Sequence, residues 1–182
     1  MNLAELQAGL LALLKSREQD PRHDHPYFRQ IASSGRLSVL REISAWWRGL
    51  AIEETCVLTS TLLKRRGTFG QVAGRFADRP DATPHHQEQA AVFLAEMARH
   101  GDPLVAAVAR FEGALLAVVS GEATGPVTIP WQHAPYAVLE GLLLGAPLDE
   151  ERIHGAYRVV VGPEIPGLFR VEPVAAGGGR TG

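Results

Sequence analysis

The sequence of 182 residues contains one cysteine, Cys56, and no long run of apolar residues. One thiol cannot form a disulfide within the chain or build a thiolate metal site. No apolar run reaches the roughly 18 residues that a membrane-spanning helix needs. The opening residues do not resemble a signal peptide either, because Glu5 and Gln7 interrupt the apolar residues and no basic segment precedes them. We therefore expect a cytoplasmic protein.

An excess of charge of either sign is also lacking. Lysine and arginine total 18 and aspartate and glutamate total 20, so the net charge is −2 with neutral histidines. This balance gives no overall attraction to nucleic acid or to an anionic membrane. With 46% apolar and 21% charged residues, the composition is that of a globular protein with one domain and an appendage, or with two small domains.

Motifs for nucleotide binding and for nucleophilic catalysis are absent. No glycine-rich dinucleotide fingerprint occurs, and the segment 67–70 lacks the spacing and the lysine of a phosphate-binding loop. No serine lies in a Gly-x-Ser-x-Gly elbow. Cys56 lies in a mostly apolar segment, where core packing is its usual role. The residues therefore predict no self-sufficient active site, and we do not expect an enzyme.

Histidine is the remaining candidate for metal binding or acid–base chemistry. His23 and His25 lie in a loop bounded by prolines, with no further ligand beside them. His85 and His86 are adjacent, so on a helix they diverge by about 100° and cannot form the i, i+4 pair of a zinc protease. We predict that this chain binds no metal or other cofactor, and a small enzyme that uses His85 or His133 is the weaker alternative.

Amphipathic patterns fill the first two-thirds of the chain. Apolar residues recur at helical spacing in the segments 3–14, 37–50, 52–64, 69–76, 93–97 and 104–118. The last segment has the clearest start, because Asp102 is a good N-cap and Pro103 suits the first helical position. Glu112 lies on the flank of its apolar stripe. Because an unpaired buried charge costs several kcal/mol, we predict a structural ion pair between Glu112 and an arginine or lysine outside its own helix.

The pattern changes after residue 125. The segment 127–129 alternates like a strand, 135–144 is compatible with a helix, and 156–161 and 168–173 are two further strand candidates joined by residues 162–167. We therefore predict an α+β fold. It comprises a helical N-terminal domain over residues 1–121, a small α/β or β-hairpin domain over residues 126–174, and a flexible tail over residues 175–182.

One part of the chain carries a family resemblance. It comprises Phe93-Leu-Ala-Glu96, the break that contains Asp102, and Val108-Ala-Arg-Phe-Glu-Gly-Ala114. These residues resemble the end of a bacterial helical domain that was once described as DNA-binding. The general shape extends over roughly residues 27–120. The sequence departs from the family pattern at residues 101–105, where that family often has Leu-Pro-Tyr-Leu, and at residues 46–48, near which a Phe-Pro pair is usual.

The better understood members of that family are partner proteins of multinuclear iron enzymes with TIM-barrel folds. Those enzymes modify cysteines in ribosomally made precursor peptides, as in methanobactin biosynthesis. The resemblance implies a non-catalytic protein that forms a heterodimer with such an enzyme and helps to bind the leader of the precursor peptide. It places the iron in the partner enzyme and no cofactor in this chain.

In such partners a β-containing C-terminal region helps to recognise the leader peptide. We therefore expect the peptide to add as a strand to an outer edge of the predicted hairpin, where unpaired backbone groups are available. Proline at Val160 should then weaken binding. The residues expected at the peptide site are Tyr157, Val159, Val160, Val161, Leu168, Phe169 and Val171.

A DNA-binding transcriptional regulator is the alternative function. Its surface would comprise the basic residues Arg41, Arg48, Lys64, Arg65 and Arg66. Acidic residues at positions 42, 53 and 54 are interleaved with them, and this mixture favours an ordinary solvated helix face. Nucleic acid is therefore the less favoured partner.

Overall fold

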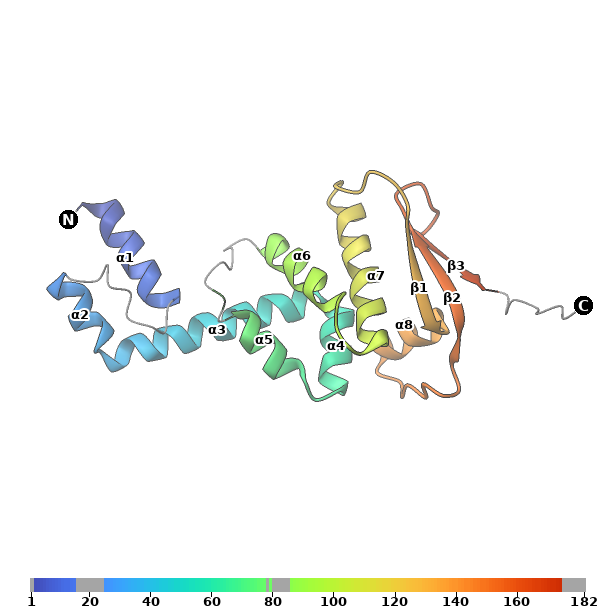
Figure 1. Cartoon of the computed structure of the whole chain (residues 1–182), viewed down its shortest axis with the longest axis horizontal. Helices are drawn as coiled ribbons and strands as arrows, with labels where there is room; N and C mark the ends of the chain where they lie inside the picture. The colour runs from blue at the N-terminus through green and yellow to red at the C-terminus, as the bar shows by residue number, and fades with distance from the viewer. Residues whose placement is uncertain (1, 16–24, 78, 80–85, 175–182) are drawn as a thin grey trace, which may run out of the picture.

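The computed structural model describes residues 2–15, 25–77, 79 and 86–174. Within this part of the chain, eight helices and three strands form an α+β fold with a helical N-terminal part and a small C-terminal sheet, as the sequence predicts (Figure 1). No helix among these residues is long and apolar enough to cross a membrane. The predicted tail, residues 175–182, falls outside the described residues.

Two short helices and the first half of a long one form a module at one end of the molecule (Figure 1). They are α1 (Leu3–Lys15), α2 (Pro26–Ala32) and α3 (Gly35–Thr55). Leu13, Phe28 and Leu37 form the small core of this module. Gly9 lets the phenyl ring approach α1, because a Cβ there would lie 2.2 Å from Phe28 Cζ. The module therefore has its own core, separate from the larger one.

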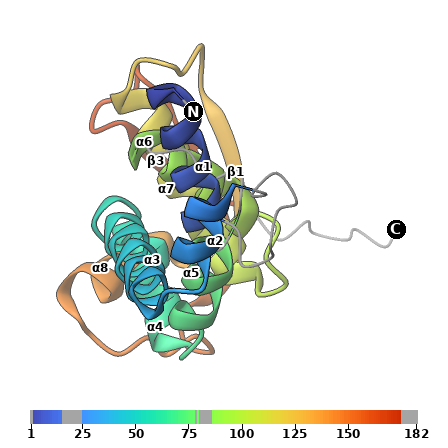
Figure 2. The same cartoon turned by 90° about the vertical axis from the view of Figure 1, so that its left-hand side faces the viewer.

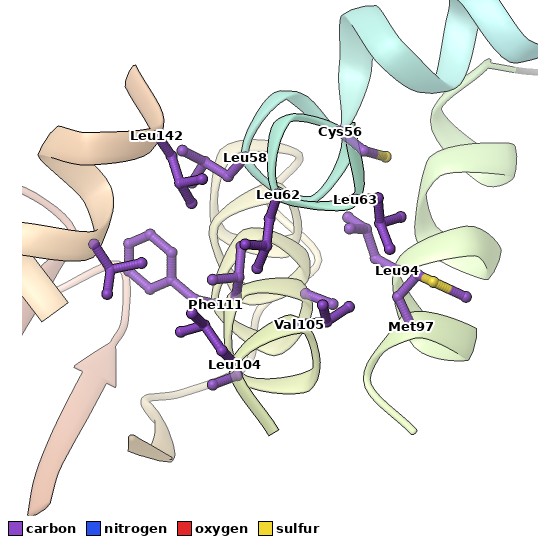
Figure 3. Packing of buried hydrophobic residues seen from close by; sticks show 14 of the residues in the cluster. Cys56, Leu58, Leu62, Leu63, Leu94, Met97, Leu104, Val105, Phe111 and Leu142 are labelled. Atoms are coloured by element: carbon purple, nitrogen blue, oxygen red, sulfur yellow. The ribbon is translucent and has the colours of Figure 1, made fainter. Parts of the chain in front are cut away.

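The larger core surrounds α7 (Pro103–Val119), which packs against α4 (Val57–Arg65) and α6 (His86–Met97). The remaining helix of this part, α5 (Phe69–Ala77), contacts α3 and α4. The first turn of α7 forms as predicted: Asp102 Oδ1 accepts hydrogen bonds from the Leu104 and Val105 amides at 2.8 and 3.3 Å. Figure 3 shows Val105 of α7 on the side of Leu63 of α4 and Met97 of α6, whereas the ring of Phe111 points away from α6, towards α8.

The sheet covers the opposite side of α7. Its strands are β1 (Val127–His133), β2 (His154–Val161) and β3 (Phe169–Pro173), and α8 (Pro135–Leu144) lies between β1 and β2 in the sequence. Both strand pairs are antiparallel and the order is β1-β2-β3. The Phe111 ring contacts the rings of Trp131 and Phe169, with centroids 5.6 and 5.1 Å apart. One continuous cluster of buried side chains therefore joins the helices to the sheet.

The position of β2 corrects one prediction. β2 and β3 form a hairpin, as expected, but β1 pairs along the other side of β2, with Thr128 opposite Val160. β2 is therefore the central strand and has no free edge. A proline at Val160 would remove a ladder hydrogen bond inside the sheet rather than a donor on an exposed edge, so it cannot serve as a test of peptide binding.

Candidate functional site

The outer edge of β3 offers backbone groups for a further strand. Leu168 O accepts a hydrogen bond from Gly162 N, and Val174 N donates one to Ala156 O, both at 2.9 Å. Backbone groups that face the neighbouring strand alternate along an antiparallel ladder. The backbone groups of Phe169, Val171 and Pro173 therefore point away from β2 along the open edge, and Pro173, at the end of the strand, has no N–H to donate.

The opposite edge of the sheet is less suited to strand addition. In the register of β1 and β2, Val127, Ile129 and Trp131 face β2 with their backbone groups. The backbone of Pro130 therefore points outward, and proline has no N–H to donate. A proline on an outer edge is one of the features that discourage edge-to-edge pairing. Pro130 lies in the middle of β1 whereas Pro173 lies at the end of β3, and the geometry thus favours β3 over β1.

The structure divides the predicted peptide residues into two groups. Tyr157, Val159, Val160 and Val161 lie on the central strand, and the three valines are buried. Their side chains cannot contact a peptide at the sheet edge. Leu168, Phe169 and Val171 lie at or next to the open strand, and all three side chains are half-buried.

Sequence reasoning missed a side chain beside this edge. Tyr136, in the first turn of α8, is exposed, and its ring centroid lies 6.0 Å from that of Phe169. No short-range signal could have identified it, because 33 positions separate Tyr136 from Phe169 in the sequence.

Glu112 is buried in α7, as predicted, but its partners are different from those expected. Its Oε1 accepts a hydrogen bond from the Leu58 amide at 2.8 Å, and its Oε2 accepts one from the Thr59 amide at 2.9 Å. These amides lie in the first turn of α4, where the helix has free N–H groups and a partial positive charge. Among the described residues, this helix terminus takes the place of the expected arginine or lysine.

Burial raises the pKa of the Glu112 carboxyl, while hydrogen bonds from Thr59 and from the Leu58 amide oppose the shift. The Thr59 hydroxyl is buried beside this carboxylate, and its Oγ1 makes no hydrogen bond of good geometry within the described residues. Burial, with a further contribution from Glu112, raises the pKa of the Cys56 thiol to about 12. Cys56 is therefore a protonated core residue, and its predicted packing role is confirmed.

The segment that carries the family resemblance holds three helices together. Phe93 and Leu94 of α6 are buried in the main core. Arg110 of α7 donates from Nη2 to Ala98 O at the end of α6, at 2.8 Å. Glu112, two positions further on, binds the start of α4. The residues Phe-Leu and Ala-Arg-Phe-Glu thus have structural roles, which neither exclude nor require a partner protein.

A polar cluster lies where the helices meet the C-terminal part. Arg66 donates from Nε to Asp102 Oδ2 at 2.9 Å, and its Nη1 and Nη2 lie 2.7 and 2.9 Å from the two carboxylate oxygens of Glu150. His133 is near this cluster, and burial lowers the pKa of its imidazole below the ordinary value. The neighbouring His154 and Arg66 lower this pKa as well, whereas the carboxylates of Glu150 and Asp102 oppose the shift. The rings of His133 and His154 lie 5.6 Å apart.

This cluster does not form a metal centre. No group of three or more His, Cys, Asp or Glu side chains in the described part of the chain could hold a metal ion. His25 is the N-cap of α2, and its Nδ1 accepts a hydrogen bond from the Tyr27 amide at 3.2 Å. His23 and His85 lie outside the described residues. The alternative hypothesis, a small enzyme that uses His85 or His133, is therefore not tested at His85.

The five basic residues proposed for DNA binding all have contacts within the chain. Arg41 donates from Nε and Nη2 to Leu13 O, at 2.9 and 2.7 Å, and Arg48 donates to Ala77 O. Lys64 pairs with Glu53, Arg65 binds the carbonyl oxygens of Gly141 and Ala146, and Arg66 belongs to the polar cluster. These contacts use the guanidinium and ammonium groups that a phosphate would need.

Comparisons with known proteins give no family for the chain. No family model matches it, no curated protein matches it, and no solved structure matches it.

Proposed function

We propose that this chain is a non-catalytic partner protein, which binds a ribosomal precursor peptide and presents it to an iron enzyme for cysteine modification. The observation that carries the proposal is the open edge of β3, with the outward N–H and C=O groups of Phe169 and Val171. An extended peptide can gain main-chain hydrogen bonds on such an edge. We also propose that the protein is located in the cytoplasm, where precursor peptides are made.

The resemblance over residues 93–114 supports the identity of the partner. It suggests a multinuclear iron enzyme with a TIM-barrel fold, with the metal in that enzyme and none in this chain. Neighbouring genes give the first test: we expect one for such an enzyme and one for a short peptide with cysteines. Co-expression of the chain with that enzyme should yield a stable heterodimer, and two proteins that elute separately would count against the proposal.

The peptide site has a sharper test at Val171. Proline there removes one outward N–H and places its ring on the open edge, so it leaves the β2–β3 ladder intact. Alanine at the same position removes the same packing but keeps the N–H. We expect Val171→Pro to weaken binding about tenfold more than Val171→Ala, because one hydrogen bond and close approach of the backbone are both lost.

The assay is a calorimetric titration of the leader peptide encoded beside the gene. Circular dichroism spectra of both variants should match that of the wild type, which shows that the sheet still forms. Equal affinities of two folded variants would exclude strand addition at β3. The titration is repeated at several salt concentrations, because phosphate binding by a DNA-binding protein weakens steeply with salt whereas main-chain pairing does not.

A further inference from the structure

The outward side of α3 carries a regular stripe, whose members are exposed except for the half-buried Leu50. Its spacings alternate between four and three residues, as in the seam of a coiled coil. The stripe comprises Arg36, Leu40, Ile43, Trp47, Leu50 and Glu54. Leu40, Ile43 and Trp47 are between 46% and 58% exposed, and Val39 and Trp46 beside them are 52% and 61% exposed.

Leu37, Ala51 and Ile52 of α3 are buried in the protein, so the helix carries apolar residues on its inner side as well as on its outer side. Its inner side includes Arg41 and Arg48, whose guanidinium groups bind main-chain oxygens of α1 and α5. Seen along α3, α1 and α2 lie to one side of the helix (Figure 2). A cluster of exposed tryptophan, isoleucine and leucine side chains of this kind marks an interaction surface.

The stripe is symmetric about its midpoint: apolar positions mirror apolar positions, and a basic position mirrors an acidic one. About position 45, Arg36 mirrors Glu54, Leu40 mirrors Leu50 and Ile43 mirrors Trp47. In an antiparallel pair of identical helices, each of these residues therefore faces its mirror residue on the other copy. Apolar residues meet in the four central layers, and an arginine meets a glutamate at each end.

Charge selects this arrangement over the parallel one. In a parallel pair, Arg36 would face Arg36 and Glu54 would face Glu54, which is repulsive at both ends. Neither side chain has a hydrogen bond or an ion pair of its own within the described part of the chain. Both are exposed and therefore available to a second copy.

We propose that two copies of this chain associate through antiparallel packing of their α3 helices, with Arg36 of each copy paired with Glu54 of the other. With roughly 100 Å² exposed on each of five large apolar side chains per copy, the contact buries about 1,000 Å² in total, the lower limit of a specific interface. Dimerisation is therefore weak, with a Kd in the micromolar range.

Sedimentation velocity from about 1 to about 100 µM tests the association, since a micromolar dimer forms within this range. We expect a monomer at the low end and a dimer at the high end. Trp47→Glu should raise the Kd more than a hundredfold, because it puts a charge in two central layers. Val119→Glu, at an exposed position on α7, is the matched control and should leave the Kd unchanged. A monomer throughout the range, or a dimer that Trp47→Glu leaves intact, overturns the proposal.

Charge exchange tests the orientation. Arg36→Glu and Glu54→Arg should each raise the Kd about tenfold, because each places like charges at both ends of the helix pair. A mixture of the two single variants should recover the wild-type affinity as a heterodimer, and so should the double variant. Single variants that dimerise as tightly as the wild type contradict the antiparallel register, because a parallel pair has like charges at both ends before and after either exchange.

The dimerisation test is independent of peptide binding, because β3 lies at the other end of the molecule from the first half of α3 (Figure 1). The partner enzyme is the competing occupant of the α3 surface. If Trp47→Glu abolishes capture of the iron enzyme while the wild-type chain remains a monomer, the surface belongs to that enzyme and the dimer is refuted. If Trp47→Glu no longer dimerises but still captures the iron enzyme as well as the wild-type chain does, the result supports the proposal.

Discussion

Replacing Glu112 with glutamine tests how the buried carboxylate holds α4 to α7. The wild-type side chain accepts the Leu58 and Thr59 amides at once. Glutamine has nearly the same volume but only one acceptor oxygen, so its NH2 group must face one of the two amide donors. A buried N–H without a partner costs about 1–3 kcal/mol. We therefore expect the free energy of unfolding to fall by about that amount at neutral pH.

Urea unfolding gives this free energy directly, and thermal unfolding should show a Tm lowered by roughly 3–10 °C for a chain of this size. Glu122→Gln is the matched control, because Glu122 is exposed and the same chemical change there should alter stability by less than about 0.5 kcal/mol. If Glu112→Gln changes the free energy of unfolding no more than the control does, the hydrogen bonds from the two amides to the carboxylate do not stabilise the fold, and the reasoning is refuted.

The pH dependence gives a second criterion. Burial raises the pKa of Glu112 in the folded state above its ordinary value of 4.5. Its contribution to stability is therefore fully present below pH 4.5 and is lost as the pH rises through the folded-state pKa. The glutamine variant lacks this titration. The difference in stability between wild type and Glu112→Gln should thus widen as the pH falls from 7 towards 4.5, and a difference that narrows would contradict the raised pKa.

Two further predictions concern the core. Phe111→Ala should lower the free energy of unfolding by about 3–5 kcal/mol, measured by urea unfolding, because it removes the ring between Trp131 and Phe169; a loss below about 1 kcal/mol would contradict this central role. Cys56 should not react with a thiol reagent such as Ellman's reagent at pH 8 in the folded protein, since its pKa is about 12 and it is buried, and it should react fully in urea.

Local chemistry made several features predictable from the sequence. Asp102 and Pro103 fix the start of α7 through contacts within a single turn, and apolar periodicity located most helices and all three strands. The turn after β2 was equally clear, because Gly162, Pro163, Pro166 and Gly167 cannot continue a strand. Each of these signals involves residues that are close in sequence.

Features that depend on distant segments were not predictable in the same way. Which strand lies at the centre of the sheet depends on how Val127–His133 returns to pair with β2, and an alternating pattern does not specify that. Periodicity likewise identified the apolar stripe of Leu40, Ile43 and Trp47, but it did not show that this side of the helix faces solvent while Arg41 and Arg48 face the protein. For the candidate site, the sequence proposed residues of both β2 and β3 and could not show that the valines of β2 are buried and that β2 has no free edge.

The contact of Glu112 with α4 has a consequence for how the sequence of this protein can vary. Both donors are main-chain groups, which every residue except proline supplies. Positions 58 and 59 can therefore change side chain without losing the hydrogen bonds, provided that the new residue fits the core, whereas position 112 must keep a carboxylate of this length. A comparison of diverged sequences should find a constant glutamate with no co-varying partner, so co-variation would not detect this contact.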